Sequence, residues 1–437
     1  MTQLHDQANP QGEALFGRAK RDGAQLFREW YAGLEVAAAE GTPTAYVFVM
    51  GSLAEILRCF DFNVVFPEIN SLQTAVRHVA HEFLTEAEDY GYSPDICGYV
   101  KADVAVQLRG GDHPNGRIPK PDLAVLTNAC NTYIKWAEVW ERMYGTPVFT
   151  LDVPATRTHG GQTWPGDDGF ASDLAYVTHQ IRELIAQCEA VTGIPFDIDR
   201  LREAMGHSNA MSKAWARCIE LNKSRPAPYN AVVDGTVYLG VMNALKATPE
   251  GRRYFDDLVV ELEAQVAAGV GAVEPEKYRL GFVGVPCYPI FRRFNELFTE
   301  WGGVFVGSSY LWFASGGMNL GYEFDLKRPI ESLAEGTLIS VRDAMDSMFW
   351  HVDTMNELVD TYAMDGVVFH PIKSCRTVST GLADSRRALM ELRDVPTLFL
   401  ESDMMDRRVV SEAQLKNRID AYFENLATRA KLARRSA

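Results

Sequence analysis

Short apolar runs alternate with helix-like stretches in two separate parts of this sequence. Four runs lie in the first part, at residues 44–50, 63–68, 122–130 and 147–154, and four in the second, at residues 279–286, 303–310, 364–370 and 395–403. Strands that alternate with helices form parallel sheets, because two parallel neighbours need a crossover connection between them. The sequence therefore predicts an α/β fold.

The stretches around these runs set the expected domain boundaries. Residues 13–40 carry apolar side chains at helical spacing, and residues 170–269 read as mostly helical. The two α/β domains are expected to be parallel-sheet domains of the Rossmann or flavodoxin type. The expected parts are an N-terminal helical segment (1–43), a first α/β domain (44–165), a helical middle section (166–277), and a second α/β domain with a C-terminal helix (278–437).

The charge of the chain excludes some classes of partner. The formal net charge is −15 over 437 residues, so nucleic acids and anionic membranes are not expected as main partners. The first twenty residues are polar, and no apolar run approaches the roughly 18 residues that a membrane helix needs. We therefore expect a cytoplasmic protein.

The seven cysteines are not spaced as a disulfide framework or as a compact metal motif, since their number is odd and no CxxC pair occurs. Three of them stand inside expected helices and read as small buried hydrophobes: Cys59, Cys188 and Cys218. The other four stand in loops or directly after strands: Cys97, Cys130, Cys287 and Cys375.

The four cysteines in loops or directly after strands are candidate metal ligands because of where they stand in the predicted fold. Ligands of open parallel sheets bind at the carboxyl ends of the strands, so cysteines from the two domains can face one another there. Soft thiolates bind zinc, copper(I) or iron–sulfur clusters, and three thiolates leave a fourth position open. Spacing alone does not separate zinc from a cluster, and structural cysteines remain an alternative.

Several segments resemble the benzoyl-CoA reductase and 2-hydroxyacyl-CoA dehydratase family. GYSPDICGYV, DLAVLTNACNTYIKW and GVVFHPIKSC resemble its three cysteine-bearing motifs. FPEIN resembles an early motif, and VPTLFLESDMMDRRVVSEAQLKNRIDAYFE resembles the closing signature. The resemblance runs from about residue 44 to 430. It implies a 4Fe–4S cluster bound through Cys97, Cys130 and Cys375.

The resemblance also implies an activity. The segment GVPCYPIFRRFNELFTEWGG looks most like the larger cluster-bearing subunit of the ATP-dependent aromatic-ring reductases. Such an enzyme converts benzoyl-CoA to a cyclic diene with electrons from ferredoxin. The implied partners are a homologous cluster-bearing subunit and an ATP-hydrolysing activator with its own 4Fe–4S cluster. This chain has no GxxxxGK[ST] phosphate loop, which agrees with ATP hydrolysis elsewhere.

Two alternatives remain open at the level of function. One is a subunit of a radical 2-hydroxyacyl-CoA dehydratase, and the other is a zinc-stabilised or ligand-binding α/β protein without redox chemistry.

Individual residues carry further hypotheses. His370 is a candidate proton donor because histidine titrates near neutral pH, although a hydrogen-bonded structural histidine is the alternative. Tyr310 is expected to line a substrate cavity. Cys287 is expected to line it too, or to be a buried thiol, rather than to complete the cluster. Glu68 either tunes proton transfer or caps the following helix.

Overall fold

The computed structural model describes residues 16–154, 165–166, 169–315, 321–345 and 348–436. It contains two four-stranded parallel sheets, which confirms the expected α/β fold. The first sheet has the order β2-β1-β3-β4 and the second β6-β5-β7-β8, so the two share one strand order. The strands are β1 (Thr44–Val47), β2 (Asn63–Val65), β3 (Leu123–Thr127), β4 (Val148–Leu151), β5 (Tyr278–Gly284), β6 (Gly303–Ser308), β7 (Gly366–His370) and β8 (Thr397–Phe399).

The first half surrounds its sheet with helices on both faces. These helices are α1 (Arg18–Glu40), α2 (Ala54–Arg58), α3 (Pro67–Val76), α4 (Ala80–Tyr90), α5 (Gly98–Leu108) and α6 (Asn131–Tyr144). The sequence over about residues 71–90 predicts one helix after the second strand, and this prediction is wrong because the chain breaks between α3 and α4. His78 adopts a left-handed backbone conformation there, with φ of 63°, which a continuous helix cannot contain.

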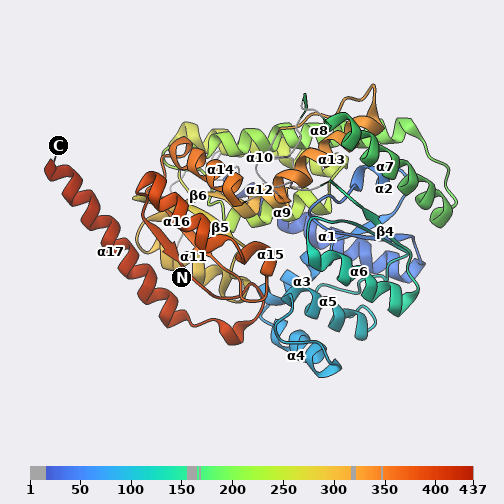
Figure 1. Cartoon of the computed structure of the whole chain (residues 1–437), viewed down its shortest axis with the longest axis horizontal. Helices are drawn as coiled ribbons and strands as arrows, with labels where there is room; N and C mark the ends of the chain where they lie inside the picture. Colours follow the sequence, from blue (N-terminus) through green and yellow to red (C-terminus); the bar gives the residue numbers. More distant parts are fainter. Residues whose placement is uncertain (1–15, 155–164, 167–168, 316–320, 346–347, 437) are drawn as a thin grey trace.

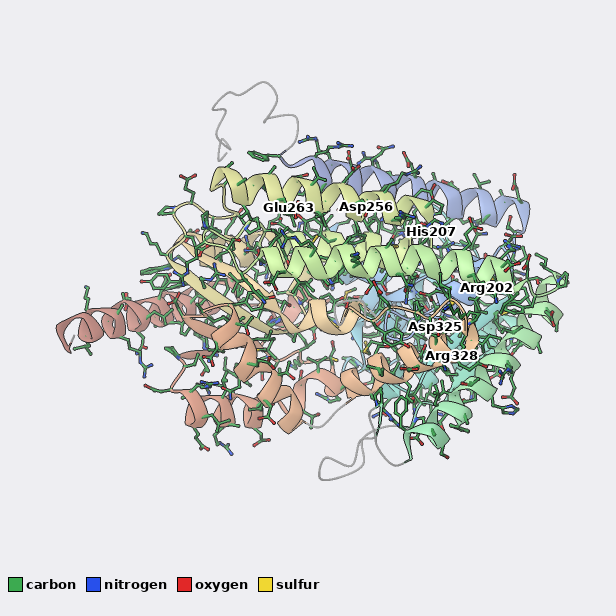
Figure 2. The ribbon with its side chains drawn as sticks, turned by 90° about the horizontal axis from the view of Figure 1, so that it is seen from above. Arg202, His207, Asp256, Glu263, Asp325 and Arg328 are labelled. Carbon is green, nitrogen blue, oxygen red and sulfur yellow. The ribbon has the colours of Figure 1, made fainter. Side chains whose placement is uncertain are left out.

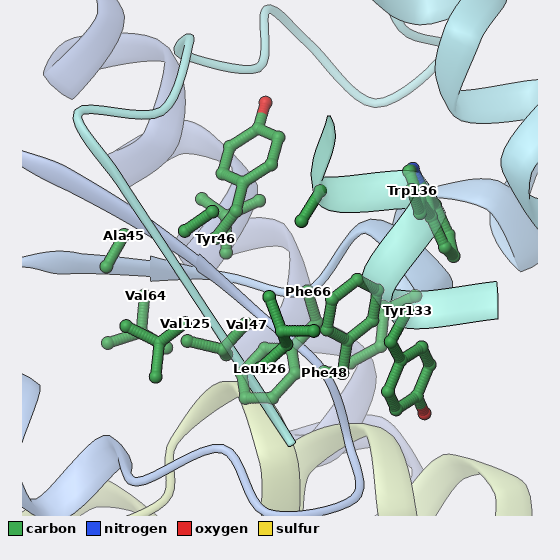
Figure 3. Packing of buried hydrophobic residues seen from close by; sticks show 14 of the residues in the cluster. Ala45, Tyr46, Val47, Phe48, Val64, Phe66, Val125, Leu126, Tyr133 and Trp136 are labelled. Carbon is green, nitrogen blue, oxygen red and sulfur yellow. The ribbon is translucent and has the colours of Figure 1, made fainter. Parts of the chain in front are cut away.

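The core of the first half is aromatic on the side that α6 covers. Figure 3 shows Phe48, at the end of β1, next to Tyr133 and Trp136 of α6. The rings of Phe48 and Tyr133 stack with centroids 3.8 Å apart. The indole nitrogens of Trp136 and Trp140 both donate to Asp103 Oδ2, at 2.7 and 2.8 Å. The buried carboxylate of α5 is thereby satisfied, and it fixes α6 against the sheet.

Four long helices form the middle of the chain: α7 (Phe170–Thr192), α8 (Ile198–Leu221), α9 (Val233–Ala244) and α10 (Pro249–Ala268). Figure 2 shows α8, which carries Arg202 and His207, beside α10, which carries Asp256 and Glu263. Side-chain caps start both helices, since the Asp197 carboxylate accepts from Asp199 N–H and the Thr248 hydroxyl from Gly251 N–H. Helix α1 packs against α9 and α10 and extends this helical layer.

The second half repeats the arrangement around β5 to β8. The helices in this part of the chain are η1 (Tyr288–Ile290), α11 (Phe291–Thr299), α12 (Ser309–Ala314), α13 (Pro329–Met345), α14 (Met348–Thr361), α15 (Arg376–Ser379), α16 (Leu382–Arg393), η3 (Arg407–Val409) and α17 (Glu412–Ser436). Of these, α13 packs against α7 and α8 of the middle section. In Figure 1 the two sheets lie in separate halves, and α17 runs along the outer side of the second half before its end projects outward. Within the described residues, no helix is both long and apolar enough to cross a membrane.

Close contacts join the two halves beside α5. A Cβ atom on Gly98 would lie 2.6 Å from Met405 Cβ, so only glycine allows this approach. Arg408 donates to both carboxylate oxygens of Glu88, at 2.7 and 2.9 Å, and buried Lys101 donates to the same carboxylate at 2.8 Å. These hydrogen bonds, chiefly the one from Arg408, lower the pKa of Glu88 to about 2. The contact holds the start of α5 against the second half.

Candidate active site

A cavity of about 220 Å³ lies where the two sheets face each other. Val49 follows β1, Cys130 follows β3, Val285 follows β5, and Phe369 lies at the end of β7; all four line the cavity. In each sheet these strands are the central pair, where the strand order reverses. Open α/β sheets bind ligands at the carboxyl ends of the strands at such a reversal. The cavity therefore occupies the expected ligand position of both sheets at once.

Three cysteines line this cavity, and each stands directly before a helix. Cys97 precedes α5, Cys130 precedes α6, and Cys375 precedes α15. All three are partly exposed, whereas Cys287 is fully buried. The N-termini of α5 and α6 carry partial positive charge, which favours a negatively charged group at Cys97 and Cys130. The fold thus gathers three cysteines that are far apart in the sequence.

The thiols influence one another electrostatically. Burial raises the pKa of Cys97 well above its usual range, and the nearby Cys375 and Cys130 raise it further. Burial also raises the pKa of Cys375 to about 11, with a contribution from Cys130. Free thiols are therefore protonated at these two positions at neutral pH, and a metal that binds them must displace the protons. Cys130 Sγ lies 3.4 Å from Thr377 Oγ1, a contact between the two halves.

Three cysteines at one cavity could supply soft sulfur donors to a metal centre. In the described part of the chain, no three or more His, Cys, Asp or Glu side chains are grouped so that they could hold one metal ion. An iron–sulfur cluster would be held differently, because each thiolate binds a different iron atom of the cluster. The side chains that could hold such a group here are Cys97, Cys130 and Cys375.

The cavity wall also contains one carboxylate, Glu68. Its Oε1 accepts from the Tyr133 hydroxyl at 2.7 Å and its Oε2 from Val49 N–H at 2.8 Å. Burial raises the pKa of Glu68 to about 7, although both hydrogen bonds oppose the shift. Among the described residues that line the cavity there is no Lys, Arg, His or Asp. Glu68 is thus the carboxyl group at this cavity in the described residues, and its place in FPEIN after a strand was the indication in the sequence.

Tyr310 lines the cavity as expected for a substrate-contacting residue. Burial raises its pKa to about 12, and the neighbouring hydroxyls of Tyr288 and Tyr99 partly oppose this. Tyr310 is therefore neutral at physiological pH and keeps its hydroxyl proton. Trp312 and Phe313 follow Tyr310 closely in the sequence and are predicted either to wall the cavity or to be core aromatics, but their side chains lie outside the described residues.

His370 and Cys287 do not line the cavity. His370 Nδ1 lies 2.6 Å from the Val285 carbonyl and Nε2 lies 2.5 Å from Ser402 Oγ, so both ring nitrogens have partners. Burial lowers the pKa of His370 to about 4, which keeps the ring neutral. Ser402 Oγ also lies 3.5 Å from Cys287 Sγ. This geometry matches the alternatives given for both residues, a hydrogen-bonded structural histidine at position 370 and a buried thiol at Cys287. The proton-donor role of His370 and the substrate-contacting role of Cys287 stay predictions.

Comparison with known proteins identifies the relatives of this chain. The family described as 2-hydroxyglutaryl-CoA dehydratase, D-component, matches residues 51–426. The chain belongs to this family. A benzoyl-CoA reductase subunit of Thauera aromatica is 33% identical over 88% of this chain and 89% of its own length. The alpha subunit of (R)-2-hydroxyisocaproyl-CoA dehydratase of Clostridioides difficile is 27% identical over 94% and 96%. These findings confirm the family resemblance seen in the sequence.

Other members are more distant. The alpha subunit of (R)-2-hydroxyglutaryl-CoA dehydratase of Acidaminococcus fermentans is 24% identical over 85% of this chain and 89% of its own length. The names of these relatives describe subunits of redox or dehydratase enzymes. The family therefore includes both reductases and dehydratases.

Proposed function

We propose that this chain is the iron–sulfur subunit of an ATP-dependent reductase that acts on aromatic-ring CoA thioesters such as benzoyl-CoA. The observation that carries the proposal is the meeting of Cys97, Cys130 and Cys375, from two α/β halves, at one largely apolar cavity. Similarity to a benzoyl-CoA reductase subunit over most of the chain supports the same activity.

The mostly apolar lining of the cavity suits an aromatic ring. Apolar side chains such as Val285, Leu358 and Leu389 make up most of the wall, and Glu68 is the only acidic residue among the described lining residues. A benzene ring needs apolar contact, whereas a 2-hydroxyl group needs a polar partner in a dry site. The dehydratase activity named for several relatives remains the second candidate.

A 4Fe–4S cluster held by Cys97, Cys130 and Cys375 would supply electrons of low potential. The chain itself contributes three further functions. The two docked halves exclude water from a reaction that stray protons would quench. Glu68, with its pKa near neutrality, holds a proton at its carboxyl group and can deliver it to the reduced ring. Tyr133 and Val49 N–H orient that carboxyl group toward the cavity.

The proposal includes partner proteins. The chain carries no GxxxxGK[ST] loop, so ATP is hydrolysed on another chain, which passes electrons from its own 4Fe–4S cluster. A homologous cluster-bearing subunit completes the enzyme, and ferredoxin is the external donor. Coupling to ATP is needed because a ferredoxin-type donor, at about −400 mV, reduces an acceptor of much lower potential only to a vanishing extent.

The test uses the complex purified anaerobically with its own partner subunits. It is incubated with reduced ferredoxin and benzoyl-CoA under three conditions: with ATP, without ATP, and with a non-hydrolysable ATP analogue. We expect diene formation only with ATP. Equal diene formation in all three conditions contradicts ATP coupling. Conversion of a 2-hydroxyacyl-CoA to an enoyl-CoA without conversion of benzoyl-CoA identifies a dehydratase instead.

A further inference from the structure

An aromatic stripe of three residues, Trp136, Trp140 and Tyr144, runs along α6 from the cysteine cavity to the surface. Its members stand four residues apart, so they are neighbours on one side of the helix. Trp136 lines the cavity, Trp140 is fully buried, and Tyr144, the last residue of α6, is 37% exposed. The stripe therefore connects the place where the three cysteines meet with solvent.

The side chains of the stripe are linked by close contacts. The ring centroids of Trp136 and Trp140 lie 5.8 Å apart, and that of Tyr46 on β1 lies 4.9 Å from Trp140. Figure 3 shows Tyr46 and Trp136 in the same core. The Tyr144 hydroxyl donates to Gln107 Oε1 at 2.9 Å, and Gln107 Nε2 donates to the Tyr46 hydroxyl at 3.4 Å. These contacts form an unbroken series from the cavity wall to the exposed phenol.

The two indoles of the stripe share a proton acceptor. Both N–H groups donate to Asp103 Oδ2, at 2.7 Å from Trp136 and 2.8 Å from Trp140. Burial raises the pKa of Asp103 to about 6, and its hydrogen bonds, first that from Trp136, oppose the shift. Asp103 is therefore mainly ionised at neutral pH and can accept a proton. An indole that loses an electron becomes a strong acid, so a carboxylate at its N–H makes that loss easier.

The chemistry of these side chains sets the direction in which the stripe can carry electrons. Tryptophan and tyrosine give an electron to a strong oxidant, but they do not accept one from a donor of very low potential. The stripe therefore cannot deliver reducing electrons to the cavity, and it can only supply electrons to an oxidising group there. Oxygen-derived oxidants also convert cysteines to sulfinic and sulfonic acids, which are not readily reduced again.

We propose that Trp136, Trp140 and Tyr144 protect the cysteine cavity by supplying an electron to oxidising radicals that form there from oxygen or peroxide. A hydroxyl radical takes one electron from Trp136 and becomes hydroxide, while Asp103 takes the indole proton. Electrons then pass from Trp140 to Trp136 and from Tyr144 to Trp140, and Asp103 returns the proton. The Tyr144 phenol loses its proton to solvent, and hydroxide takes up a proton to become water.

The exposed end of the stripe completes this route. The phenoxyl radical left on Tyr144 is at the surface, where a soluble thiol can reduce it. The inference rests on the proposed function only for the source of the radicals, because reduced iron at the cavity converts peroxide to hydroxyl radical. The electron path itself depends on the described aromatic side chains alone.

The first test supplies the oxidant by light and needs no iron. In the full chain with Cys97→Ala and Cys375→Ala, Cys130 is the one cysteine that is not buried, so it can be labelled with a thiol-reactive ruthenium photosensitiser. After a laser flash with an external electron acceptor, transient absorption should show a tryptophan radical that decays into a tyrosine radical. Tyr144→Phe should remove most of the tyrosine radical. Tyr176→Phe, at an exposed tyrosine of α7 that donates to Asp152, should leave it unchanged.

The second test exposes the reduced complex, purified anaerobically with its partner subunits, to a limited amount of oxygen. Mass spectrometry measures sulfinic and sulfonic acid at the three cavity cysteines. We expect Trp136→Phe and Tyr144→Phe to raise this oxidation several-fold. Trp215→Phe, at a buried tryptophan of α8 outside the stripe, should not change it. Freeze-quench electron paramagnetic resonance should show a tyrosyl radical in the wild type that Tyr144→Phe lacks.

The outcomes separate this inference from the proposed function. Equal tyrosine radical yields of Tyr144→Phe and Tyr176→Phe under light overturn the electron path, whether or not the complex contains iron. Cysteine oxidation that Tyr144→Phe leaves unchanged in an iron-containing complex overturns the protective role. Iron and sulfide are measured in the same preparations. A complex without iron contradicts the proposed cluster and this source of radicals, while the light-driven test still decides the path.

Discussion

The two halves have the same strand order but use the ends of their strands differently. In the first half, Glu68 follows β2, lines the cavity and has a pKa raised to about 7. In the second half, His370 ends β7 but turns into the core between Phe282 and Phe294, with a pKa lowered to about 4. Burial favours the neutral form of both groups. Of these two residues, Glu68 has both a shifted pKa and access to the cavity, whereas His370 has only the shifted pKa. A shifted pKa alone therefore does not identify a proton donor.

The cysteines extend the comparison. Cys130 follows β3 and Cys375 follows β7, which are equivalent strands of the two sheets, and both line the cavity. Cys287 follows β5, the equivalent of β1, and is buried against Ser402. Shared topology therefore supplies equivalent positions, but the local turn decides whether a side chain faces the cavity.

The largest expected effect concerns the three cavity cysteines. Cys97→Ala, Cys130→Ala and Cys375→Ala should each lose the iron–sulfur cluster, because a site with three thiolates cannot hold it with two. Cys287→Ala is the matched control from a strand end and should keep its iron. The measurement is iron and acid-labile sulfide per chain after anaerobic purification. Unchanged iron in any of the three variants removes that cysteine from the site.

The next effect separates Glu68 from His370. Glu68→Gln should lower turnover of the complex about a hundredfold or more, which is the usual contribution of a positioned acid, while the chain stays folded. Wild-type turnover should also fall as pH rises above 7, where Glu68 loses its proton. His370→Gln should instead cost about 2 kcal/mol of stability, because buried partners lose their hydrogen bonds, with little change in turnover per folded chain. The reverse pattern would assign proton transfer to His370.

A third prediction concerns stability and pH, measured by urea unfolding of the cluster-free chain. The folded-state pKa of Glu68 lies above the ordinary 4.5, so its stabilisation is complete below pH 4.5 and is lost as pH rises through 7. Glu88 has the opposite sign: its pKa of about 2 gives stability above pH 4.5 that is lost as pH falls toward 2. Between pH 4.5 and 7 the wild-type chain should lose on the order of 3 kcal/mol of its free energy of unfolding through Glu68. The Glu68→Gln variant should not show this loss.

Glu88→Gln should leave the change in the free energy of unfolding between pH 4.5 and 7 as it is in the wild type. It should reduce the pH dependence of that free energy only below pH 4.5. Identical pH profiles of the two variants would contradict the opposite electrostatic environments of these carboxylates.

The smallest expected effect concerns the Thr377 hydroxyl, which lies 3.4 Å from Cys130 Sγ. A hydrogen bond to a ligating sulfur stabilises the more negative, reduced cluster. Thr377→Val should therefore make the reduction potential more negative without loss of iron, and Thr377→Ser should restore it. A redox titration followed by electron paramagnetic resonance measures the change. Equal reduction potentials of Thr377→Val and Thr377→Ser would show that the Thr377 hydroxyl does not influence the cluster.

Much of the fold was predictable from the sequence, because buried parallel strands leave short, continuous apolar runs between helices. The strand-end rule also selected Cys130 and Cys375. The same rule selected Cys287, which the structure buries, since it cannot tell which way a turn faces. The break at His78 was missed because no glycine or proline marks that left-handed residue. A cavity of about 540 Å³ between α1, α3 and α9 could not be predicted from the sequence, because its walls come from three helices that only the folded chain brings together.

The division of the thiols between the halves has a consequence for biosynthesis. Cys97 and Cys130 are synthesised well before Cys375, and the three meet only after both sheets have formed and docked. A group that requires all three sulfurs would therefore not be complete on a nascent chain before Cys375 has left the ribosome and the two halves have docked. Once loaded, such a group would stabilise the docked arrangement by mass action. Loading of the proposed cluster would thus be a late step in folding, and oxygen that reaches the free thiols before it would compete directly with it.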